Sequence, residues 1–240
     1  MAASVKTSIN KTARVAGFLY LLLVPFSVFG IIYVPTTLVA PGDAATTADN
    51  IMASEGLFRS GTVSHLIGQT IFIFLVLVLY RLLKSVNRNQ AVAMVVLALV
   101  GVPIAFINEI NHFAVLLLLS GADYLAAFEP KQLQAQVMLF LELREYGIVI
   151  AQIFWGLWLF PLGYLVFKSN FLPWAIGILV MISGFGYLID STVLFLFPGF
   201  DVTISLFTFI GELLLPLWLL IKGVNVDRWE KMSSCSPPPS

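Results

Sequence analysis

The chain has 240 residues, of which 59% are hydrophobic and 11% are charged, and its formal net charge is zero. Soluble domains carry roughly 25% charged residues, so the composition excludes an ordinary soluble domain and indicates an integral membrane protein. A net charge of zero argues against nucleic acid as a partner, because that partner needs a concentrated basic surface. The single cysteine, Cys235, excludes an intrachain disulfide, and a free thiol fits a reducing compartment.

Residues 1–14 are polar and form a predicted cytoplasmic N-terminal segment ahead of a first apolar run, residues 15–34. That run has about the length that a bilayer requires. It is longer than the apolar core of a cleaved signal peptide, so we expect a retained helix. Pro25 is expected to kink this helix and Pro35 to end it, because proline has no N–H to donate and its ring clashes with the preceding turn.

The next two segments predict a surface helix and a second membrane span. Pro41-Gly42-Asp43 is a turn signal, and residues 44–58 after it are too polar to span a bilayer. We expect a short helix on the extracytoplasmic surface there. Residues 61–83 form the second span, in which His65 and Gln69 lie one turn apart on one face.

Residues 91–119 form the third predicted span, which Gly101 and Pro103 are expected to kink. This apolar run contains a polar patch with two ionisable side chains, made up of Asn108, Glu109, Asn111 and His112. An ionisable group at membrane depth costs several kcal/mol unless it is paired, neutralised or wetted, so it normally faces the protein interior. The patch is therefore the first candidate for a functional site.

Residues 131–167 predict one helix that is longer than a membrane is thick. Spacings of three and four place a stripe of residues on one of its faces, with the members Met138, Glu142, Glu145, Val149, Gln152 and Gly156. Counting along the helix places Glu142 and Glu145 at the outer interface. Arg144 lies between them and is expected to form a solvated ion pair there.

Two further spans follow. Residues 172–197 form the fifth and carry Asp190 near its outer end. Pro198-Gly199 is the expected turn, and residues 202–221 form the sixth span, with Glu212 at mid-depth. Both acidic side chains are candidates for buried polar chemistry, since each lies inside an apolar run.

Together these elements predict an all-α polytopic membrane protein, a six-transmembrane-helix bundle in one domain over residues 15–222, with a short extracytoplasmic surface helix. Residues 223–240 are polar and are predicted to form a disordered cytoplasmic tail. Lysine and arginine concentrate at the N-terminus, in alternate connections and in the tail, so the positive-inside rule places both termini in the cytoplasm. An even number of spans agrees with that orientation.

Four short runs in the chain resemble a known family in their order and spacing. They are Pro41-Gly42-Asp43-Ala44, Leu119-Ser120-Gly121-Ala122-Asp123-Tyr124, Gly163-Tyr164-Leu165 and Gly186-Tyr187-Leu188-Ile189-Asp190-Ser191. The family is the mainly bacterial membrane family called domain of unknown function 4386 (DUF4386), and the resemblance runs from Arg14 to Gly223. It implies a multi-pass protein of the bacterial cytoplasmic (inner) membrane and brings no activity, cofactor or catalytic residue with it.

Glu109 and His112 are spaced i, i+3, the spacing by which two helical side chains can bind one metal ion in bundle proteins. Three hypotheses stay open for them: a structural pair that joins helices, a proton or ion relay, and a metal site. In the metal hypothesis, His65, Asp190 or Glu145 supplies the ligands that Glu109 and His112 still need for zinc or a similar ion, and the favoured set is His65, Glu109, His112 and Asp190. The binding or relay candidates are Glu109, His112, Asn108, His65, Gln69, Asp190, Glu212 and Glu145.

Most of these candidates lie in the outer half of the predicted spans, which predicts an outward-facing polar pocket. The leading function hypothesis is therefore a membrane protein that binds or transports a small molecule, lipid or ion. The alternatives are a membrane-embedded metal-dependent hydrolase and a structural or scaffold partner of another membrane protein.

An enzyme is the less favoured class, because the sequence has no Gly-Lys-Ser/Thr phosphate loop, no His-Glu-x-x-His pair and no Gly-x-Ser-x-Gly elbow. No cofactor is expected, apart from a divalent metal such as zinc under the hydrolase hypothesis. The expected partners are membrane lipids, a second copy of the chain or another membrane protein.

Overall fold

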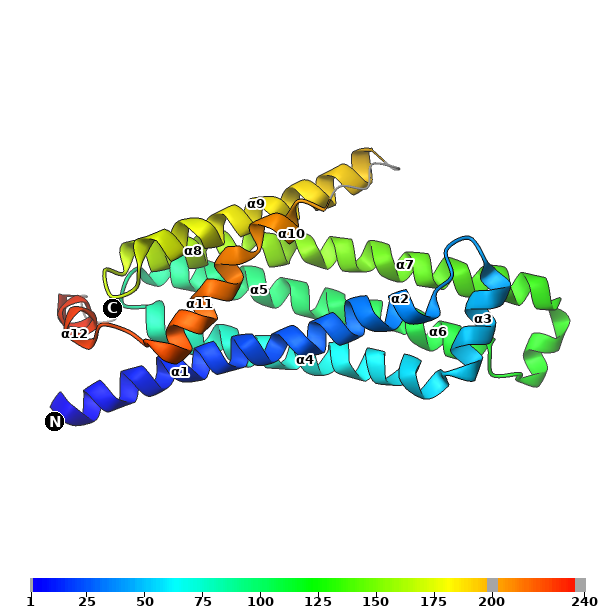
Figure 1. The fold of residues 1–240 in the computed structure, drawn as a ribbon, viewed down its shortest axis with the longest axis horizontal. Coiled ribbons are helices and arrows are strands. Elements are labelled where there is room, and N and C mark those ends of the chain that lie inside the picture. The colour runs from blue at the N-terminus through cyan, green and yellow to red at the C-terminus, as the bar shows by residue number, and fades with distance from the viewer. Residues whose placement is uncertain (1, 198–202, 236–240) are drawn as a thin grey trace. The chain divides into compact units, whose positions relative to one another are not determined.

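The computed structural model describes residues 2–197 and 203–235, and every regular element in these ranges is helical (Figure 1). The elements in chain order are α1 (Ala2–Ser27), η1 (Val28–Tyr33), α2 (Val34–Leu38), α3 (Ala44–Ala53), α4 (Glu55–Leu83), α5 (Arg88–Asn108), α6 (Ile110–Leu118), η2 (Asp123–Ala127), α7 (Pro130–Leu157), α8 (Leu159–Lys168), α9 (Trp174–Leu196), α10 (Ser205–Thr208), α11 (Ile210–Ile221) and α12 (Val226–Cys235). The segment η1 is a π-helix and η2 is a 3-10 helix. The prediction of an all-α fold is confirmed.

Five helical stretches are long and apolar enough to cross a membrane. They are Ser8–Leu38, Glu55–Leu83, Arg88–Leu118, Pro130–Lys168 and Trp174–Leu196. A further stretch, Ser205–Ile221, qualifies only together with Val226–Ser234, to which it is bent by 99°. The chain is thus a polytopic membrane protein with five candidate spans, or six if the bent pair counts as one.

The first span continues past Pro35, so the predicted end at that residue is wrong. The chain stays helical from α1 through η1 into α2, and it leaves the helix only after Leu38. Pro35 lies just after the π-helical segment η1, so its missing N–H falls where the hydrogen-bond pattern of the continuous helix shifts. Pro25 lies inside α1, and the helix likewise continues through it.

The predicted surface helix is α3, which is shorter than the expected range because residues from Glu55 onward belong to α4. Asp43 caps α3: its carboxylate accepts the Thr46 N–H at 2.9 Å and the Thr46 hydroxyl at 2.7 Å. Both bonds stabilise the carboxylate and hold the pKa of Asp43 below its ordinary value. The bond from the Thr46 N–H has the larger effect and the bond from the Thr46 hydroxyl the smaller one. One face of α3 is buried, with Thr47 and Ile51 both 0% exposed.

The third span is interrupted at Glu109, while α5 continues through Pro103 and ends at Asn108. The Glu109 N–H donates to the Phe106 oxygen, three residues back, at 3.2 Å. An i to i−3 bond of this kind closes a tighter turn than the i to i−4 bonds of an α-helix do. The regular helix resumes as α6 at Ile110. The irregular turn therefore coincides with Glu109, the acidic residue of the polar patch.

The fourth span is a single stretch from Pro130 to Lys168, which confirms the prediction of a helix longer than the membrane is thick. It is interrupted only at Trp158, which separates α7 from α8. The Trp158 side chain is buried, and its ring lies 5.0 Å from that of Phe72 and 6.1 Å from that of Tyr20, between ring centroids.

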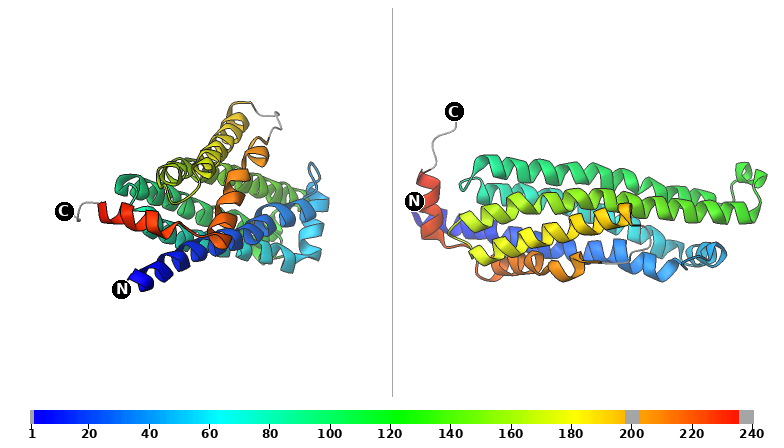
Figure 2. Two further views of the ribbon diagram at one scale, coloured as in Figure 1. Left: turned by 60° about the vertical axis from the view of Figure 1, so that its left-hand side comes forward. Right: turned by 90° about the horizontal axis from the view of Figure 1, so that it is seen from above.

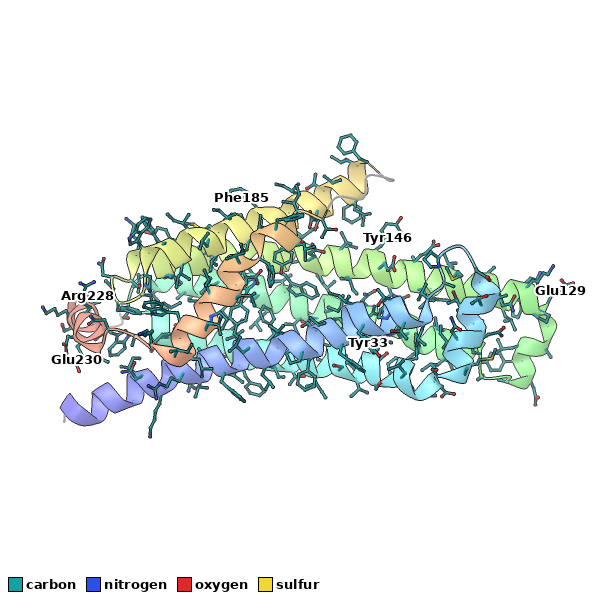
Figure 3. The ribbon with its side chains drawn as sticks, in the orientation of Figure 1. Tyr33, Glu129, Tyr146, Phe185, Arg228 and Glu230 are labelled. Carbon is teal, nitrogen blue, oxygen red and sulfur yellow. The ribbon has the colours of Figure 1, made fainter. Side chains whose placement is uncertain are left out.

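Part of the tail predicted to be disordered is the helix α12, so that prediction is wrong for residues 226–235. The Asn225 side chain accepts the Arg228 N–H at 3.1 Å, as a helix cap does. Arg228, labelled in Figure 3, donates to the Asn170 oxygen at 3.0 Å, and the Trp229 indole donates to the Leu82 oxygen at 3.1 Å. These bonds hold a polar segment that cannot build a core of its own. The predicted turn at Pro198-Gly199 lies outside the described residues.

Residue contacts group the chain into two compact units, and the expectation of one domain over residues 15–222 stays a prediction. Unit 1 consists of Met1–Leu22, Ile71–Val102 and Ala151–Ser240, and unit 2 consists of Leu23–Thr70 and Pro103–Ile150. In unit 1, α9 packs against α8, α10 and α11, and Figure 2 shows α8 and α9 side by side.

Unit 2 has an apolar core that draws on α2, α3, α4, α6 and α7. Its buried members are Val34, Leu38, Ile51, Phe58, Val115, Val137 and Leu141. In Figure 1, α3 lies crosswise to α2 and α4. Ile51 is the buried member that α3 contributes to this core. The polar patch of the third span belongs to the same unit.

Candidate functional site

Glu109 is the centre of the candidate site, and its side chain is only 1% exposed. It stands at the interruption between α5 and α6, where its backbone oxygen accepts the N–H of His112 at 3.0 Å and that of Phe113 at 3.3 Å. A buried carboxylate needs partners for its charge and its lone pairs. Three side chains of unit 2 supply them, and we call the set His65, Glu109, His112 and Arg144 the Glu109 cluster.

His65, on α4, makes the shortest contact of the cluster. Its Nδ1 lies 2.6 Å from Glu109 Oε1, and its side chain is 0% exposed. Its other nitrogen, Nε2, lies 3.3 Å from the amide nitrogen of Gln69, one turn further along α4. The Gln69 amide can donate to Nε2 only if that atom carries a lone pair, which leaves the ring proton on Nδ1 for Glu109. The one-turn spacing of His65 and Gln69 predicted from the sequence is confirmed as a contact.

Arg144, on α7, pairs with the same carboxylate oxygen. Its Nη2 lies 3.0 Å and its Nε 3.2 Å from Glu109 Oε1, and its side chain is 3% exposed. A guanidinium group stays charged in proteins, so Glu109 compensates a charge that would otherwise be isolated in a buried place. The predicted solvated pairing of Arg144 with Glu142 and Glu145 is therefore wrong.

The buried face of α7 explains the error. Val137, Leu141 and Arg144 follow one another at spacings of four and three, and all three are buried. The stripe that contains Glu142 and Glu145 is the neighbouring face, and both of these side chains are exposed. Tyr146, two residues beyond Arg144 and labelled in Figure 3, is 47% exposed.

The π-helical segment η1 provides a second partner for Arg144, whose Nη2 donates to the Gly30 oxygen at 3.3 Å. In an α-helix that oxygen would accept the N–H of Val34, but this N–H donates to Phe29. In a π-helix the donor would be residue 35, which is proline and has no N–H. The shifted helix pattern and Pro35 together leave the Gly30 carbonyl for the guanidinium group.

Two glycines bring the helices of the site close together. A Cβ atom on Gly30 would lie 2.7 Å from the Gly61 oxygen and 3.1 Å from His65 Cβ, so only glycine lets η1 approach α4 at this point. A Cβ atom on Gly147 would overlap the side chain of Asn108. Asn108 uses that space to donate from Nδ2 to the Arg144 oxygen at 2.8 Å, which ties α5 to α7.

His112, on α6, contacts the second carboxylate oxygen. Its Nδ1 lies 3.1 Å from Glu109 Oε2 and 2.7 Å from the Thr62 hydroxyl oxygen. If Nδ1 is protonated, it can donate to the Thr62 oxygen, and the Thr62 hydroxyl can then donate to the Phe58 oxygen, 3.5 Å away. Glu109 Oε2 has no hydrogen-bond partner in the part of the chain that the structure describes. If Nδ1 is not protonated, the Thr62 hydroxyl can donate to it instead. The site thus accommodates a proton on His112 Nδ1 or its absence without moving a heavy atom.

A small cavity borders the cluster in unit 2, with a volume of about 20 Å³, which is room for one water molecule. Its polar lining is His112, Arg144 and Glu145, and its apolar lining comes from α2, α4 and α7 together with Val39, which follows α2. Glu145 is exposed, whereas His112 is buried. The predicted candidate Glu145 therefore borders the cluster through the cavity and is not one of its members.

The other two predicted candidates, Asp190 and Glu212, belong to unit 1. Both oxygens of Asp190 accept backbone N–H groups, from Ile204 at 2.7 Å and from Ser205 at 2.9 Å, so this side chain caps α10. Glu212 accepts the Tyr20 hydroxyl at 2.9 Å.

The predicted metal set is only partly assembled. Glu109 joins His65 and His112, but Asp190 is engaged with backbone amides of its own unit. Within the residues 2–197 and 203–235, no group of three or more His, Cys, Asp or Glu side chains is arranged to hold a metal ion. Arg144 also lies on the carboxylate oxygen that a metal would need.

Comparison with known proteins places the chain in a family. The family model described as Domain of unknown function (DUF4386) matches residues 15–223, which is most of the chain. The chain belongs to the DUF4386 family. A protein of Archaeoglobus fulgidus named Uncharacterized protein is 43% identical over 84 residues, 35% of this chain and 51% of that relative. The chain thus spans about half the length of that curated relative. No solved structure matches the chain.

The expected DUF4386 membership is confirmed, while the expected bacterial origin stays a prediction, because the relative from A. fulgidus is archaeal. Sequence reasoning missed two residues of the site in this DUF4386 chain. The sequence does contain a pattern that indicates a buried Arg144, since Arg144 continues the helical spacing of the apolar residues Val137 and Leu141. Thr62 has none, because a single threonine in a helix more often bonds its own backbone.

Proposed function

We propose that this DUF4386 protein is an ion carrier of the membrane, in which the Glu109 cluster binds a proton and passes it on. The observation that carries the proposal is the presence of two histidines on a buried carboxylate that Arg144 already neutralises. An arginine–glutamate pair alone would satisfy the buried charges. The two imidazole rings add nitrogen atoms that can each carry or lack a proton.

The charge count of the cluster supports proton binding. Arg144 contributes one positive charge and an ionised Glu109 one negative charge, so the cluster is neutral with both histidines neutral. One proton more gives a single positive charge that is shared over contacts of 2.6–3.1 Å. Intramembrane ionisable residues that pair with one another commonly mark ion pathways and proton relays.

Contacts inside unit 2 lead from the cavity to the carboxylate. The cavity beside Glu145 touches His112, whose Nδ1 lies 3.1 Å from Glu109 Oε2. The cavity has room for one water molecule, which can deliver a proton to His112. His65 donates its own Nδ1 proton to Glu109 Oε1 in the tautomer that leaves Nε2 for Gln69, so these contacts support proton binding at the cluster.

Proton flux into vesicles tests the proposal. Purified protein is reconstituted in liposomes that contain a pH-sensitive dye, and a potassium diffusion potential with valinomycin drives proton entry. We expect faster acidification than in protein-free vesicles and the loss of this flux in the His112→Asn variant. Asparagine keeps a donor near the position of Nδ1, so thermal stability should change little while the transferable proton is lost.

The matched control removes both charges, with Glu109→Gln and Arg144→Gln in one chain, and it should show no flux above protein-free vesicles. Equal flux in the wild type and in this double variant would contradict the proposal. In that case the polar groups would be structural, as in the scaffold hypothesis. The metal-dependent hydrolase hypothesis has no supporting observation among the described residues.

A further inference from the structure

A second pocket of unit 2 lies apart from the Glu109 cluster. It has a volume of about 280 Å³ and is lined by Ile51 and Met52 of α3, Glu55 and Arg59 of α4, Leu116 of α6, and Leu119 and Ser120, which follow α6. We call it the Arg59 pocket. None of these residues touches the carboxylate of Glu109, so the pocket calls for an explanation of its own.

The Arg59 pocket combines both signs of charge with an apolar wall. Arg59 Nε donates to Glu55 Oε1 at 2.6 Å, and the two side chains are 55% and 52% exposed. Their bond uses one N–H of the guanidinium and one carboxylate oxygen. Four N–H groups and the other oxygen take no further side-chain partner in the described part of the chain. Leu116 and Leu119 provide the apolar side.

The position of Arg59 along α4 matches the headgroup level of a bilayer. Arg59 lies about 36 Å from Leu83 at about 1.5 Å per residue, and the hydrocarbon core is about 30 Å thick. The residues that follow Arg59 on the same helical face, Val63 and Ile67, are 53% and 40% exposed. The charged pair of Glu55 and Arg59 thus lies at headgroup level, and exposed apolar residues follow it along the same face of α4.

We propose that the Arg59 pocket binds the headgroup of a zwitterionic membrane lipid of the phosphatidylethanolamine type. The guanidinium group of Arg59 binds the phosphate, for which its planar fork is suited. The carboxylate of Glu55 accepts hydrogen bonds from the primary ammonium group, and the acyl chains lie against Leu116, Val63 and Ile67. A quaternary ammonium group fits less well, because it has no N–H to donate and the lining holds no aromatic ring to receive it.

Lipid binding to the purified protein tests this assignment, which is independent of the proton proposal. Short-chain phosphatidylethanolamine, phosphatidylcholine and phosphatidylglycerol are added separately to the full-length protein in detergent, and bound lipid is counted by native mass spectrometry. We expect phosphatidylethanolamine to bind most tightly. Arg59→Gln and Glu55→Gln should each weaken its binding about tenfold or more, the effect of one charge-assisted hydrogen bond.

Lys131→Gln serves as the matched control, because Lys131 is an exposed cation of unit 2 that does not line the pocket. It should leave the binding unchanged, and all variants should keep the thermal stability of the wild type. Equal binding of phosphatidylethanolamine by the wild type and by both pocket variants would overturn the assignment. Phosphatidylglycerol binding as tightly would remove the role of Glu55, and free phosphoethanolamine binding as tightly would exclude the lipid as the ligand.

Discussion

At the scale of the residue, one carboxylate organises the site. Glu109 faces two imidazoles and a guanidinium group within 3.1 Å, and all four side chains are at most 3% exposed. A buried ion pair adds little net stability, because desolvation of both charges offsets their attraction. Breaking the pair by removing one partner is costly, since the other charge stays buried without compensation. The cluster is therefore weak evidence for stability, and proton binding is the role that we propose for it.

The glutamate–arginine pair predicts a strong non-additivity in unfolding free energy. Glu109→Gln and Arg144→Gln should each destabilise the protein by about 3–5 kcal/mol in detergent. The double variant should lose clearly less than the sum, because neither charge is then left alone. Glu145→Gln, one residue away and exposed, is the control and should stay within about 0.5 kcal/mol of the wild type. Additive losses would show that the two groups do not interact.

At the scale of the element, the site depends on two irregular helices. The π-helical segment η1 releases the Gly30 carbonyl, and the turn between α5 and α6 holds Glu109. The apolar periodicity of the sequence predicted the spans around both places. It did not predict the irregular turns, because a local shift of hydrogen bonds leaves hydropathy unchanged. Pro25 and Pro35 flank η1 in the sequence. Pro35 predicts a helix end, but the helix continues through it to Leu38.

An N–H at residue 35 should give the Gly30 carbonyl of η1 a second donor, so that the folded state depends less on the hydrogen bond from Arg144. In the Pro35→Ala variant the new N–H can donate to the Gly30 oxygen, which otherwise relies on the guanidinium group. The cost of Arg144→Gln in unfolding free energy should then fall by about 1 kcal/mol, the net value of one hydrogen bond. Pro25→Ala is the matched control and should leave that cost unchanged. An equal cost in all three backgrounds would contradict the account of η1.

The cap of α3 should show the pH dependence of a carboxylate with a lowered pKa. Such a group stabilises the folded state above its unfolded pKa and loses this contribution as the pH falls through its folded pKa. Acidification should therefore open the first turn of α3, seen as weaker protection of the Thr46 amide, which donates to Asp43, relative to the intrinsic exchange rate at the same pH. The Asp43→Asn variant should lack this acid-induced step, because asparagine caps without titrating. The same step in both proteins would exclude Asp43 as its cause.

At the scale of the whole molecule, the sequence predicted the class, the family and most of the spans from composition and periodicity. It also predicted that Glu109, His112, His65 and Asn108 matter, because polar groups in apolar runs are few. It could not show which helices meet, so Asp190 was grouped with residues of another unit and Arg144 was placed in solvent. The helix α12 was missed because its anchors, the Leu82 and Asn170 carbonyls, lie far from it in the chain.

The orientation of the chain in the membrane stays a prediction that reporter fusions can check. A reporter that is active only outside the cytoplasm should be silent when fused at Ser240 and active when fused after Asp123. The excess of lysine and arginine in the termini and in alternate connections is the physical reason. Activity at Ser240 would reverse the predicted side of the termini.

The measurement that tests the central claim most directly is ring nitrogen spectroscopy of histidine in the folded protein. The chain has two histidines, so labelling this amino acid with 15N gives the signals of His65 and His112, which the His65→Asn variant assigns. Over the pH range in which the protein stays folded, we expect the His112 ring to change its protonation state reversibly. If both rings keep one tautomer and one charge over that whole range, the Glu109 cluster does not exchange a proton, and the account is contradicted.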